Sequence, residues 1–573
     1  MEPVKNREWK IRGENDSFDG ITAICDGLKI SSLVSRLLCL RGLTDPVLAD
    51  LFLNGKLASI PDPFSLKGMT AAVDRLIKAI SSGEKILVHG DYDVDGISGT
   101  TLLVEFLSQV GAEVGYHIPL RLKDGYGLSP QAFEKALEQG VTLVVSVDCG
   151  VTAVAEAQLA KDSGIDLIIT DHHQPPETLP DAVAIVNPHQ PGCLFPDKSL
   201  AGVGVAFFLA VGLRQSLREI SYFNESRPEP DIRHLLDLVA LGTIADVVPL
   251  TGVNRLLTVV GLQVLNGGAR IGVRALQKVA AVKEIDASAV GFKLGPRLNA
   301  AGRIEDAALG VKLLLEKNKE TATEIAGLLD DFNRERQSIE MKTLRQAEMA
   351  VAELDAAKRS IVLADPDWHP GVIGIVASRL VERFNRPTFL LAIEHHQAKG
   401  SGRSTRDIHL YQALQECAEF LLGYGGHAAA AGLSLEAESI NSFAAGFEAA
   451  VVGQQPEPAT PFIEFDGEVL LEELTQETIK ELALLAPYGM GNPSPVFVVR
   501  NVSILGAKIV GEKHLKFSAR QGGFSLSAIA FGMAERQDEL EGEVDLLFSA
   551  ELNEWNGRIS VQLKVKDWQG SVG

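Results

Sequence analysis

Acidic and imidazole side chains gather at several points of this sequence, each after a short apolar run. The segment His89–Gly96 reads HGDYDVDG, Asp148–Gly150 reads DCG, Asp171–His173 reads DHH, and Asp246 lies within the apolar stretch DLVALGTIADVV. Carboxylates and imidazoles without a thiolate suit Mn²⁺ and Mg²⁺ and, less specifically, Zn²⁺ and Fe²⁺. Because these segments hold more donors than one ion needs, they predict two ions about 3.5–4 Å apart that share a bridging carboxylate.

A simpler interpretation is that acids at strand ends cap helices and solvate loops, and for any single acid it is the better one. Three acids within five residues (Asp91, Asp93 and Asp95), combined with a consecutive Asp-His-His, favour the metal site instead.

The elements that must position these residues are visible in the first half of the chain. Short apolar runs cover residues 85–89, 141–147, 165–170 and 182–186, and helical spacing occupies 71–80, 98–110 and 155–161. Apolar strands separated by helices are typical of a mostly parallel sheet covered on both faces. Ligands bind at the carboxyl ends of the strands in such sheets, so these acids and histidines are predicted to converge on one crevice.

The second half of the chain predicts a different order of elements. A buried helix is expected over 235–250, and a long helix of roughly 50 Å over about 321–354, where an apolar stripe persists without proline. Another α/β unit is expected from 361 to about 452. After the proline-rich linker 453–461, short strand patterns and the hairpin signal Asn556–Gly557 predict a small β-barrel.

The predicted fold class is therefore α/β, with a parallel-sheet domain joined by a long helix to a second α/β domain and followed by a C-terminal β-barrel. The predicted parts are an N-terminal segment 1–70, a catalytic domain 71–310, a connecting helix 311–358, a second α/β domain 359–452 and a C-terminal domain 461–573.

Composition and charge exclude several classes of protein. Of the 573 residues, 46% are apolar and 23% are charged, which is typical of globular proteins and excludes a disordered or fibrous chain. Lys and Arg number 54 against 75 for Asp and Glu, a net charge of −21. A small protein that binds nucleic acid through its overall charge would be basic. A nucleic-acid site here needs a local basic groove or metal ions.

The cysteines and the apolar stretches indicate the compartment. The five cysteines show no C-x-x-C pairing, which argues against a thiolate zinc site and against a disulfide framework. The longest apolar stretch, 202–213, is too short for the roughly 20 residues that span a bilayer. A cytoplasmic protein without a membrane segment is expected.

With these motifs in order, the sequence resembles the DHH phosphoesterase superfamily, whose name describes Asp171-His172-His173, and within it the RecJ-like exonucleases specific for single-stranded DNA. The resemblance implies a DHH domain, a DHHA1-like second α/β domain and an OB-like barrel. The matching motifs are HGDYDVDG (89–96), SVDCG (146–150), ITDHH (169–173), VNPHQPGC (186–193), LAGVGVAF (200–207), ALGTIADVVPL (240–250), GPRLNAAGRI (295–304), WHPGVIGIVASRL (368–380), KGSGRS (399–404), GGHAAAAG (425–432) and APYGMGNPSPVF (486–497).

The resemblance implies roles for the acids and histidines. One ion would be held by Asp93 with help from His89, and Asp148 would bridge it to the second ion. His173 would contact the scissile phosphate, and Asp91 would support the site. The ligands of the second ion would be Asp95, His172 and Asp246.

Two small-residue segments could bind nucleic acid. Small residues let backbone approach a ligand closely, and the guanidinium fork fits phosphate. The simpler interpretation is a tight helix start with surface arginines. The resemblance implies that such residues grip the 5′ end and its phosphate, which would set the direction of digestion. The candidates in the two segments are Arg297, Asn299 and Arg303, and Ser401 and Arg403.

Three further residues are candidates for contacts with the nucleic acid. Arg121 could contact the backbone, and Tyr126 could stack on a base, although a Tyr beside Gly is as often packed in a turn. His427 lies in a glycine-rich loop, where a lone histidine is more often a structural hydrogen-bonding group. The resemblance to the DHH-associated domain favours a substrate contact for it.

The implied function is metal-dependent 5′→3′ exonuclease activity on single-stranded DNA that releases 5′-mononucleotides, in DNA repair and recombination. Two divalent cations, Mn²⁺ or Mg²⁺, would neutralise phosphate oxygens and lower the pKa of a shared water, so that hydroxide attacks phosphorus in line and the 3′ oxygen leaves. Beyond single-stranded DNA, the implied partners are a single-strand-binding protein and a helicase. The chain is expected to be a monomer.

Two alternatives remain open at the level of the sequence. One is a DHH-family phosphodiesterase that acts on pyrophosphate, short oligonucleotides or cyclic dinucleotides; such enzymes are typically shorter. The other is a non-catalytic replication factor that binds single-stranded DNA. The GPRLNAAGR segment and the C-terminal domain favour a long polymer substrate, and the complete set of motif carboxylates favours an enzyme.

Overall fold

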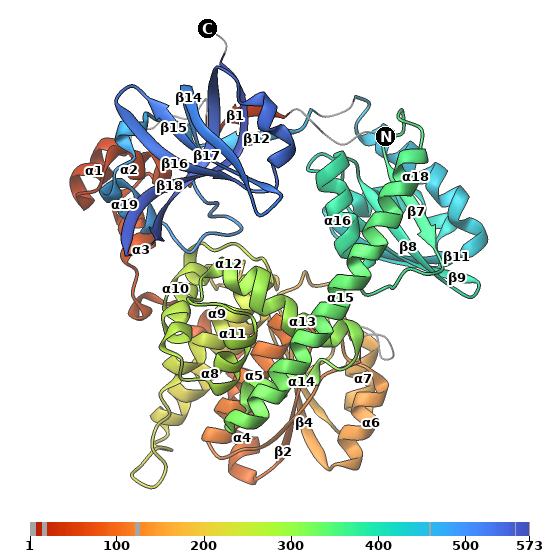
Figure 1. Ribbon diagram of the computed structural model, residues 1–573. Helices are drawn as coiled ribbons and strands as arrows, with labels where there is room; N and C mark the ends of the chain where they lie inside the picture. Colours follow the sequence, from red (N-terminus) through yellow and green to blue (C-terminus); the bar gives the residue numbers. More distant parts are fainter. Residues whose placement is uncertain (1–6, 14–19, 121–126, 458–459, 556, 572–573) are drawn as a thin grey trace. The chain divides into compact units, whose positions relative to one another are not determined.

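The computed structural model describes residues 7–13, 20–120, 127–457, 460–555 and 557–571 (Figure 1), so the predicted contact residues Arg121 and Tyr126 lie outside it. The chain divides into two compact units. One comprises residues 1–10, 303–306 and 328–463, and the other comprises 11–302, 307–327 and 464–573.

The larger unit contains a five-stranded parallel sheet. Its strand order is β3-β2-β4-β5-β6, and every neighbouring pair is parallel. The sequence predicted four of these strands and missed β3, whose segment EVGYH has a glycine at its centre and little apolar character. The strands are β2 (Lys85–Gly90), β3 (Glu113–His117), β4 (Val141–Val147), β5 (Asp166–Thr170) and β6 (Ala184–Val186).

Helices cover both faces of this sheet, as predicted for a buried parallel sheet. On one face α5 packs on β2 and β3, α8 on β4 and β5, and α4 on β6; on the other, α6 packs on β4 and α7 on β5. A further layer forms where α9 packs on α5 and α8. The helices are α4 (Met69–Ser82), α5 (Val94–Gln109), α6 (Pro130–Glu138), α7 (Val154–Asp162), α8 (Gly202–Glu219), α9 (Leu236–Ala245), α10 (Gly252–Gly267), α11 (Ile271–Val279), α12 (Ala287–Ala289), α13 (Gly295–Ile304) and α14 (Ala308–Leu315).

The sheet order creates a switch point. The connection through α5 leads from β2 to β3 on one side, whereas the next strand, β4, pairs with β2 on the other side. A crevice forms at the carboxyl ends of strands where the order reverses in this way. The loops that follow β2 and β4 carry Asp91, Asp93 and Asp148, so the topology brings the predicted acids to the switch point.

The C-terminal strands form a barrel. Their order is β14-β15-β16-β18-β17, and β14 also pairs with β17, which closes the barrel. Its core continues into helices of the N-terminal segment, because Ile24, Val34 and Leu37 belong to the same buried cluster as the barrel residues. These elements are α1 (Ile21–Leu28), α2 (Ser32–Cys39), α3 (Pro46–Asn54), β13 (Gly467–Glu468), α19 (Gln476–Ala483), β14 (Phe497–Val510), β15 (His514–Gln521), β16 (Phe524–Ala530), β17 (Glu543–Trp555) and β18 (Arg558–Gly570).

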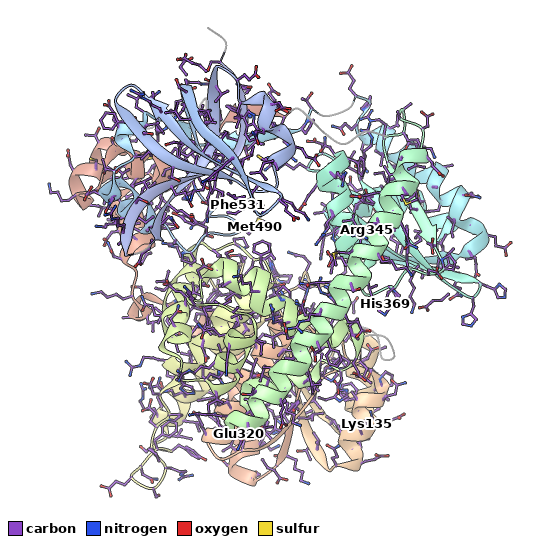
Figure 2. The ribbon with its side chains drawn as sticks, in the orientation of Figure 1. Lys135, Glu320, Arg345, His369, Met490 and Phe531 are labelled. Carbon is purple, nitrogen blue, oxygen red and sulfur yellow. The ribbon has the colours of Figure 1, made fainter. Side chains whose placement is uncertain are left out.

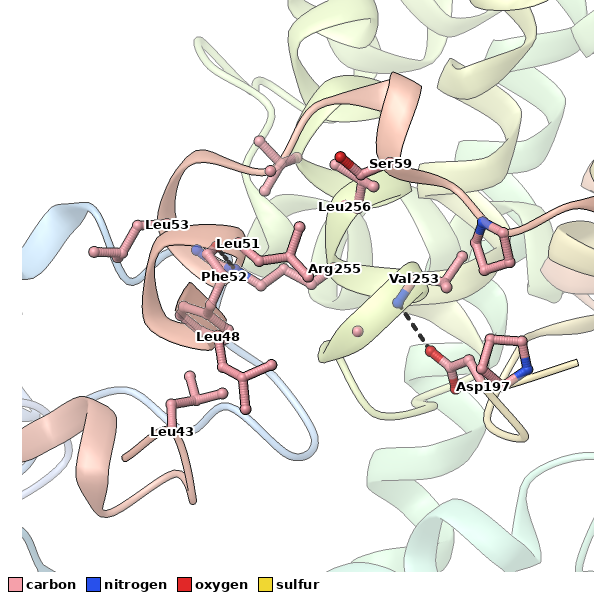
Figure 3. Close-up of a pocket in the computed structure, with 15 residues that line it drawn as sticks. Leu43, Leu48, Leu51, Phe52, Leu53, Ser59, Asp197, Val253, Arg255 and Leu256 are labelled. Carbon is pink, nitrogen blue, oxygen red and sulfur yellow. Dashed lines mark hydrogen bonds between the residues drawn. The ribbon is translucent and has the colours of Figure 1, made fainter. Parts of the chain in front are cut away.

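An apolar pocket of about 440 Å³ lies between α3 and α10 (Figure 3). Leu48, Leu51 and Phe52 line it from α3, and Val253 and Leu256 line it from α10. None of the predicted metal ligands lines this pocket.

The smaller unit contains a five-stranded sheet of order β10-β11-β9-β8-β7, in which only β7 and β8 are parallel. Alternate residues of β8 face two separate cores: Phe389 and Leu391 pack with α17 and α18, and Leu390 and Ala392 pack with α16. The elements are β7 (Ile361–Asp365), α16 (Ile373–Phe384), β8 (Thr388–Glu394), β9 (Gln397–Arg403), α17 (Leu410–Glu416), β10 (Gly423–Gly426), β11 (Ala430–Glu436) and α18 (Ile440–Gln454).

The predicted long helix is α15 (Lys319–Glu353), which contributes its first residues to the larger unit and the rest to the smaller one. A short two-stranded sheet pairs β1 (Glu8–Ile11) with β12 (Phe462–Phe465). The predicted fold class is confirmed: a parallel α/β domain, a long helix, a second α/β domain and a barrel are all present. Within the described residues no single helix is long and apolar enough to cross a membrane, and the one pair that passes jointly, α10 with α11, is bent by 81°.

Candidate metal centre

Three overlapping groups of acids and histidines converge at the carboxyl edge of the parallel sheet. Within each group the donor atoms lie within 4.8 Å of one another. Asp148 belongs to two of the groups and so does His172, which links all three into one site. The groups are Asp91, Asp93 and Asp148; Asp148, His172 and His173; and Asp95, His172 and Asp246.

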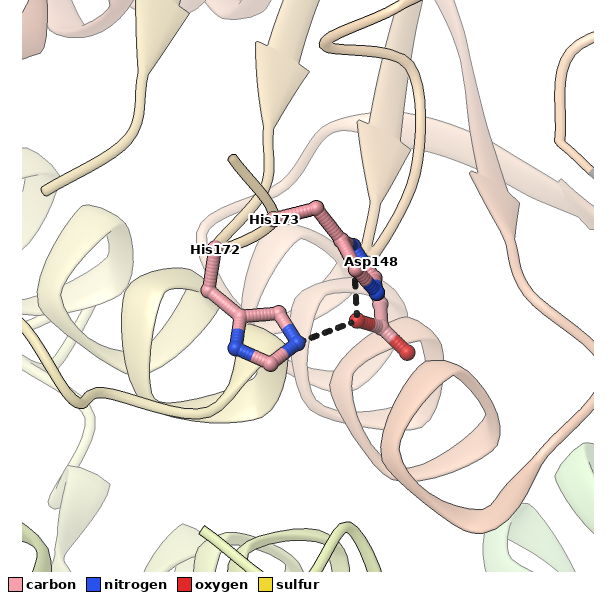
Figure 4. Close-up of side chains that lie close together, drawn as sticks. All are labelled: Asp148, His172 and His173. Atoms are coloured by element: carbon pink, nitrogen blue, oxygen red, sulfur yellow. Dashed lines mark ion pairs between the residues drawn. The ribbon is translucent and has the colours of Figure 1, made fainter. Parts of the chain in front are cut away.

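Asp148 lies at the centre of the site. Its Oδ1 is 3.1 Å from Nε2 of His172 and 4.0 Å from Nδ1 of His173 (Figure 4). The residue follows the last residue of β4 and has a φ of 62°, a left-handed conformation that turns the chain directly after the strand. Membership of two donor groups is the placement that a ligand shared by two ions requires.

Asp93 and Asp95 are placed by the start of α5. Asp93 is the N-cap, and its Oδ1 accepts hydrogen bonds from the backbone N–H groups of Asp95 (2.9 Å) and Gly96 (3.1 Å). The two-residue spacing thus gives the acids different tasks: Asp93 closes the helix end, and Asp95 lies within the first turn. Both carboxylates are held near the positive end of the helix dipole.

The Asp95 carboxylate is held by a second helix, which no pattern in the sequence connects with it. The backbone N–H groups of Gly202 and Val203, at the start of α8, donate to its two oxygens at 2.6 and 2.9 Å. Both residues belong to the LAGVGVAF motif, to which sequence analysis assigned no role. A helix N-terminus stabilises negative charge, so α8 orients Asp95 toward the site.

Asp171 holds the two histidines rather than joining the donor groups. Its Oδ1 accepts from the backbone N–H groups of His172 (2.7 Å) and His173 (3.1 Å) and lies 2.7 Å from Nδ1 of His173. Its Oδ2 accepts from the N–H of Val151. This residue was named in the motif but given no task. Its adjacency to two histidines was the available signal, because metal-site histidines usually have a carboxylate partner.

The surroundings shift the pKa values of the two adjacent histidines in opposite directions. Burial, together with the neighbouring His173, lowers the pKa of His172 to about 4, so its imidazole is neutral near pH 7 and suits a metal. Burial also lowers the pKa of His173, but the hydrogen bond and charge of Asp171 outweigh it and raise that pKa overall. The raised pKa favours the protonated form of His173, and such an imidazole beside the centre is suited to contact a phosphate oxygen.

Burial and mutual repulsion disfavour the charged forms of the acids at the centre. Burial and then the charge of Asp95 raise the pKa of Asp246 to about 9, and burial and then Asp93 raise that of Asp95 to about 7. Burial, followed by the charges of Asp95 and three other acids, raises the pKa of Asp148 well above its usual range. Like charges packed this closely are stabilised when a metal ion lies among them.

The residues present fit a divalent cation. Nε2 of His172 and Oδ2 of Asp246 are buried, and among the described residues neither has a hydrogen-bond partner. They lie 3.5 Å apart, and Asp95 Oδ2 is 4.0 Å from the same histidine nitrogen. Unpaired buried polar atoms are costly, and a shared ion would satisfy them. Carboxylate and imidazole donors are those that Mn²⁺ binds readily.

His89 does not enter these groups, although the sequence predicted a supporting ligand there. Its Nε2 lies 3.1 Å from the carbonyl oxygen of Gly127, and the residue is fully buried within β2. Its ring packs beside that of His117 on the neighbouring strand. Asp91, in the loop beyond the strand, joins Asp93 and Asp148 instead. A residue inside a strand points to one face of the sheet, whereas the loop after it faces the edge.

Gly202→Ala is expected to weaken metal binding. A Cβ at Gly202 would lie 2.7 Å from both Cβ and Oδ1 of Asp148, so the helix start or the ligand must move. Changes to groups that orient ligands typically cost about 10- to 100-fold in metal affinity. Gly204→Ala is the matched control on the same helix, since its Cβ meets only the Leu200 side chain at 3.3 Å. Titration with Mn²⁺ followed by electron paramagnetic resonance measures both; equal affinities would contradict the assignment.

The three predicted contact residues of the GPRLNAAGR segment have different hydrogen-bond partners. Oδ1 of Asn299 accepts from the N–H of Val94, the first residue of α5, so Asn299 supports the metal-binding loop. Arg297 donates to the carbonyl oxygen of Lys293, one helical turn earlier. Arg303 belongs to the smaller unit, where its Nη1 donates to the carbonyl oxygen of Gly371 at 2.7 Å.

Arg303, Ser401 and Arg403 surround the beginning of α16. A Cβ at Gly374, in the first turn of that helix, would lie 2.7 Å from Oγ of Ser401 and 3.1 Å from Nη2 of Arg403. A Cβ at Gly371 would lie 3.0 Å from the carbonyl oxygen of Arg303. Among the residues that the structure describes, no side chain caps this helix start. Glycines, a hydroxyl and two arginines at a helix N-terminus form a suitable cradle for phosphate.

His427 lies at the turn between β10 and β11, where its N–H donates to the carbonyl oxygen of Ala430. The turn is at the same end of the sheet as Arg403, because Ala430 pairs with Arg403 in the register of β11 and β9. The side chain is exposed, which leaves it accessible to a substrate.

Three family descriptions match the chain. Residues 85–243 match the DHH family, N-terminal domain; residues 349–453 match the DHHA1 domain; and residues 465–567 match the RecJ OB domain. The three matched regions coincide with the parallel-sheet domain, the second α/β domain and the barrel.

Curated proteins and solved structures resemble the chain over most of its length. The single-stranded-DNA-specific exonuclease RecJ of Bacillus subtilis is 40% identical over 568 residues, covering 98% of this chain and 70% of the relative. RecJ of Escherichia coli is 40% identical over 517 residues, covering 87% and 89%. The crystal structure of RecJ in complex with Mn²⁺ from Thermus thermophilus has a TM-score of 0.85 at 32% identity, covering 100% of this chain and 81% of that one.

Proposed function

Because the chain belongs to the RecJ family of single-stranded-DNA-specific exonucleases, we propose that it hydrolyses single-stranded DNA from the 5′ end and releases 5′-mononucleotides. The observation that carries the proposal is the convergence of buried acids and a neutral histidine on Asp148 at the switch point of the sheet. Together with a relative solved in complex with Mn²⁺, this supports a divalent-cation centre.

Each residue of the site has a distinct task in this proposal. Asp91 and Asp93 hold one side of the centre, and Asp148 is shared between its two sides. Divalent cations in such a centre neutralise phosphate oxygens and lower the pKa of water, which supplies a nucleophile near neutral pH. The residues of the other side are Asp95, His172 and Asp246.

His173 contacts the scissile phosphate. Its imidazole is partly exposed, with 37% of the side chain accessible, whereas His172 is almost enclosed. The ion pair with Asp171 keeps it oriented and raises its pKa, which favours the protonated imidazole that donates to a phosphate oxygen.

The direction of digestion is set by recognition of the strand's 5′ phosphate. Arg303, Ser401, Arg403 and the start of α16 form the cradle for this group, and the exposed His427 adds a contact at the same sheet end. Recruitment by a single-strand-binding protein and a helicase, and a monomeric state, are further parts of the proposal.

The function is tested with single-stranded and double-stranded DNA labelled at either end, in Mn²⁺, Mg²⁺ or chelator. We expect mononucleotides to be released from the 5′ end of single strands only, and no cleavage in chelator. A preference for a labelled dinucleotide over a long strand would favour a short-oligonucleotide phosphodiesterase. DNA binding that persists in chelator without any metal-stimulated cleavage would favour a non-catalytic factor.

Arg303→Ala is expected to reduce the preference for 5′-phosphorylated ends. A hydrogen bond to a charged group contributes about 1.5–3 kcal/mol, so the preference should fall roughly 10- to 100-fold. Arg297→Ala on the same helix α13 is the control, since Arg297 is not part of the cradle. It should affect phosphorylated and unphosphorylated strands equally. The ratio of kcat/KM for the two substrates decides; an unchanged ratio in Arg303→Ala would show that the phosphate is bound elsewhere.

A further inference from the structure

The Asp246 carboxylate is held differently from those of Asp93 and Asp95. Asp93 and Asp95 accept backbone hydrogen bonds, whereas Oδ2 of Asp246 is buried and has no hydrogen-bond partner among the described residues. The position of the Asp246 carboxylate therefore depends on its backbone. That backbone is the C-cap of α9, where the helix ends and the chain turns at Val247 with a φ of 61°. Val247 is 59% exposed, so little packing restrains the turn itself.

The segment after this turn is anchored by the C-terminal domain. The N–H of Leu250, which is only 2% exposed, donates to the carbonyl oxygen of Met490 at 2.8 Å. Met490, labelled in Figure 2, lies in the loop between α19 and β14, within the APYGMGNPSPVF motif that the function has not yet used. On the other side, Nδ2 of Asn254 donates to the carbonyl oxygens of Pro249 and Ser199.

The loop that carries Met490 is itself rigidly held. Gly489 and Asn492 exchange backbone hydrogen bonds of 2.9 and 3.2 Å, which forms a tight turn with Met490 and Gly491 at its tip. Asn492 is fully buried: its Nδ2 donates to the carbonyl oxygens of Leu485 and Pro487, and its Oδ1 accepts from Nε of Arg41 at 2.6 Å. A side chain with its donor and acceptor both satisfied in this way specifies one conformation of the turn.

A second set of hydrogen bonds joins α10 to the C-terminal domain. Arg255 of α10, beside the pocket of Figure 3, donates to the carbonyl oxygens of Leu484 and Leu485 at 3.0 and 2.8 Å. The segment 249–255 is thus tied to the residues before the turn as well as to its tip. The turn also fits closely against Pro249 and Leu250, because a Cβ at Gly491 would lie 3.1 Å from Cβ of Pro249, and one at Gly489 would lie 2.8 Å from Cδ1 of Leu250.

We propose that the turn 489–492 is a positioning element for Asp246, through which the C-terminal domain completes the metal centre of the catalytic domain. The inference rests on the proposed function, since it assigns Asp246 to that centre. The turn fixes Leu250, Leu250 fixes the chain four residues after Asp246, and the otherwise unsupported carboxylate is held against Asp95 and His172. The C-terminal domain then acts on cleavage as well as on any binding of DNA.

The test compares glycine variants of the full-length protein by Mn²⁺ titration, with electron paramagnetic resonance as the readout. Gly491→Ala adds a Cβ against Pro249 in a backbone with a φ of 71°. Gly542→Ala is the matched control, because it has a similar φ of 76° and its added Cβ would have no atom of the described part of the chain within 4 Å. The left-handed strain is therefore common to both variants, and the contacts with Pro249 and with Cγ2 of Thr251 (3.3 Å) are what differs.

We expect Gly491→Ala to raise the Mn²⁺ dissociation constant at least about threefold over Gly542→Ala, less than a change to a direct partner of a ligand. Excess Mn²⁺ should restore its kcat. Gly489→Ala and its control Gly523→Ala repeat the comparison at two positions where the backbone is not left-handed. Wild-type protein that binds no Mn²⁺ would overturn the proposed function and this inference together. If the wild-type protein binds Mn²⁺ and each glycine variant has the same dissociation constant as its control, the positioning role alone is overturned.

Discussion

Asp148→Asn is expected to abolish DNA cleavage while leaving the protein folded and able to bind single-stranded DNA. Asp148 belongs to two of the donor groups, so its loss disturbs both sides of the centre. A catalytic metal supplies several kcal/mol of transition-state stabilisation, and each 1.4 kcal/mol is a factor of ten in rate. The rate should therefore fall at least about a thousandfold.

Asparagine is the informative replacement because of the backbone. Asp148 has a φ of 62°, a conformation that Asn adopts more easily than other residues that have a Cβ, whereas Ala would add strain. The neutral amide also removes a buried charge that neighbouring acids repel, so in chelator the variant should be at least as stable as the wild type. Asp162→Asn, at an exposed acid on α7, is the control. Measurable cleavage by Asp148→Asn at saturating Mn²⁺ would remove Asp148 from the shared position.

Arg270→Met is expected to lower the free energy of unfolding strongly. The buried guanidinium binds Asp237 through two bonds of 2.6 and 3.1 Å, Glu105 at 2.7 Å and the carbonyl oxygen of Leu314 at 3.0 Å. Glu105 lies on α5 and Asp237 on α9, so this cation joins the two helices that carry Asp95 and Asp246. Removing one partner of a buried ion pair typically costs about 3–5 kcal/mol, because it leaves an uncompensated charge.

Denaturant unfolding at pH 7 measures this loss against a matched pair at the surface. Arg233 binds Asp231 through a similar fork, but its side chain is 74% exposed, so Arg233→Met should cost less than about 1 kcal/mol. Similar losses of unfolding free energy in the two variants would show that the buried ion pairs of Arg270 stabilise the protein no more than the surface pair does.

The same network predicts a dependence on pH. Burial alone would raise the pKa of Glu105, but hydrogen bonds and charges from His234 and Arg270 outweigh it and lower that pKa to about 2. A carboxyl with a lowered pKa contributes stability that is present above its unfolded pKa near 4.3 and is lost as pH falls toward 2. The difference in stability between wild type and Arg270→Met should therefore narrow below about pH 4. A difference that stays constant down to pH 2.5 would contradict this assignment.

The convergence of the site could be predicted from the sequence because strand order constrains it. Acids that follow β2 and β4 meet at one edge once the strands are parallel, and periodicity alone predicts parallel strands here. The contacts between Asp95 and the start of α8 could not be predicted, since Gly202 is 107 residues away and donates through its backbone. Every residue except proline has a backbone N–H, so the residue type does not reveal which N–H donates to a distant carboxylate.

Other features of the structure are not visible in the sequence for similar physical reasons. The sequence predicted supporting roles for both His89 and Asp91; Asp91 joins a donor group at the edge of the sheet, and the metal contact of His89 stays a prediction. The N-terminal helices share a core with the barrel: Leu37 and Val499 belong to one buried cluster although they lie near opposite ends of the chain, and no local pattern reports this. Asp171 was visible in the sequence, but its role in holding His173 required the geometry of the turn.

The most direct test of the account is anomalous diffraction from crystals grown with Mn²⁺. We expect two manganese peaks about 3.5–4 Å apart at the carboxyl ends of β2 and β4, with Asp148 between them and Asp246 and His172 bound to one of the ions. Manganese peaks remote from Asp148, or none in a crystal form that is active with Mn²⁺ in solution, would contradict the central claim.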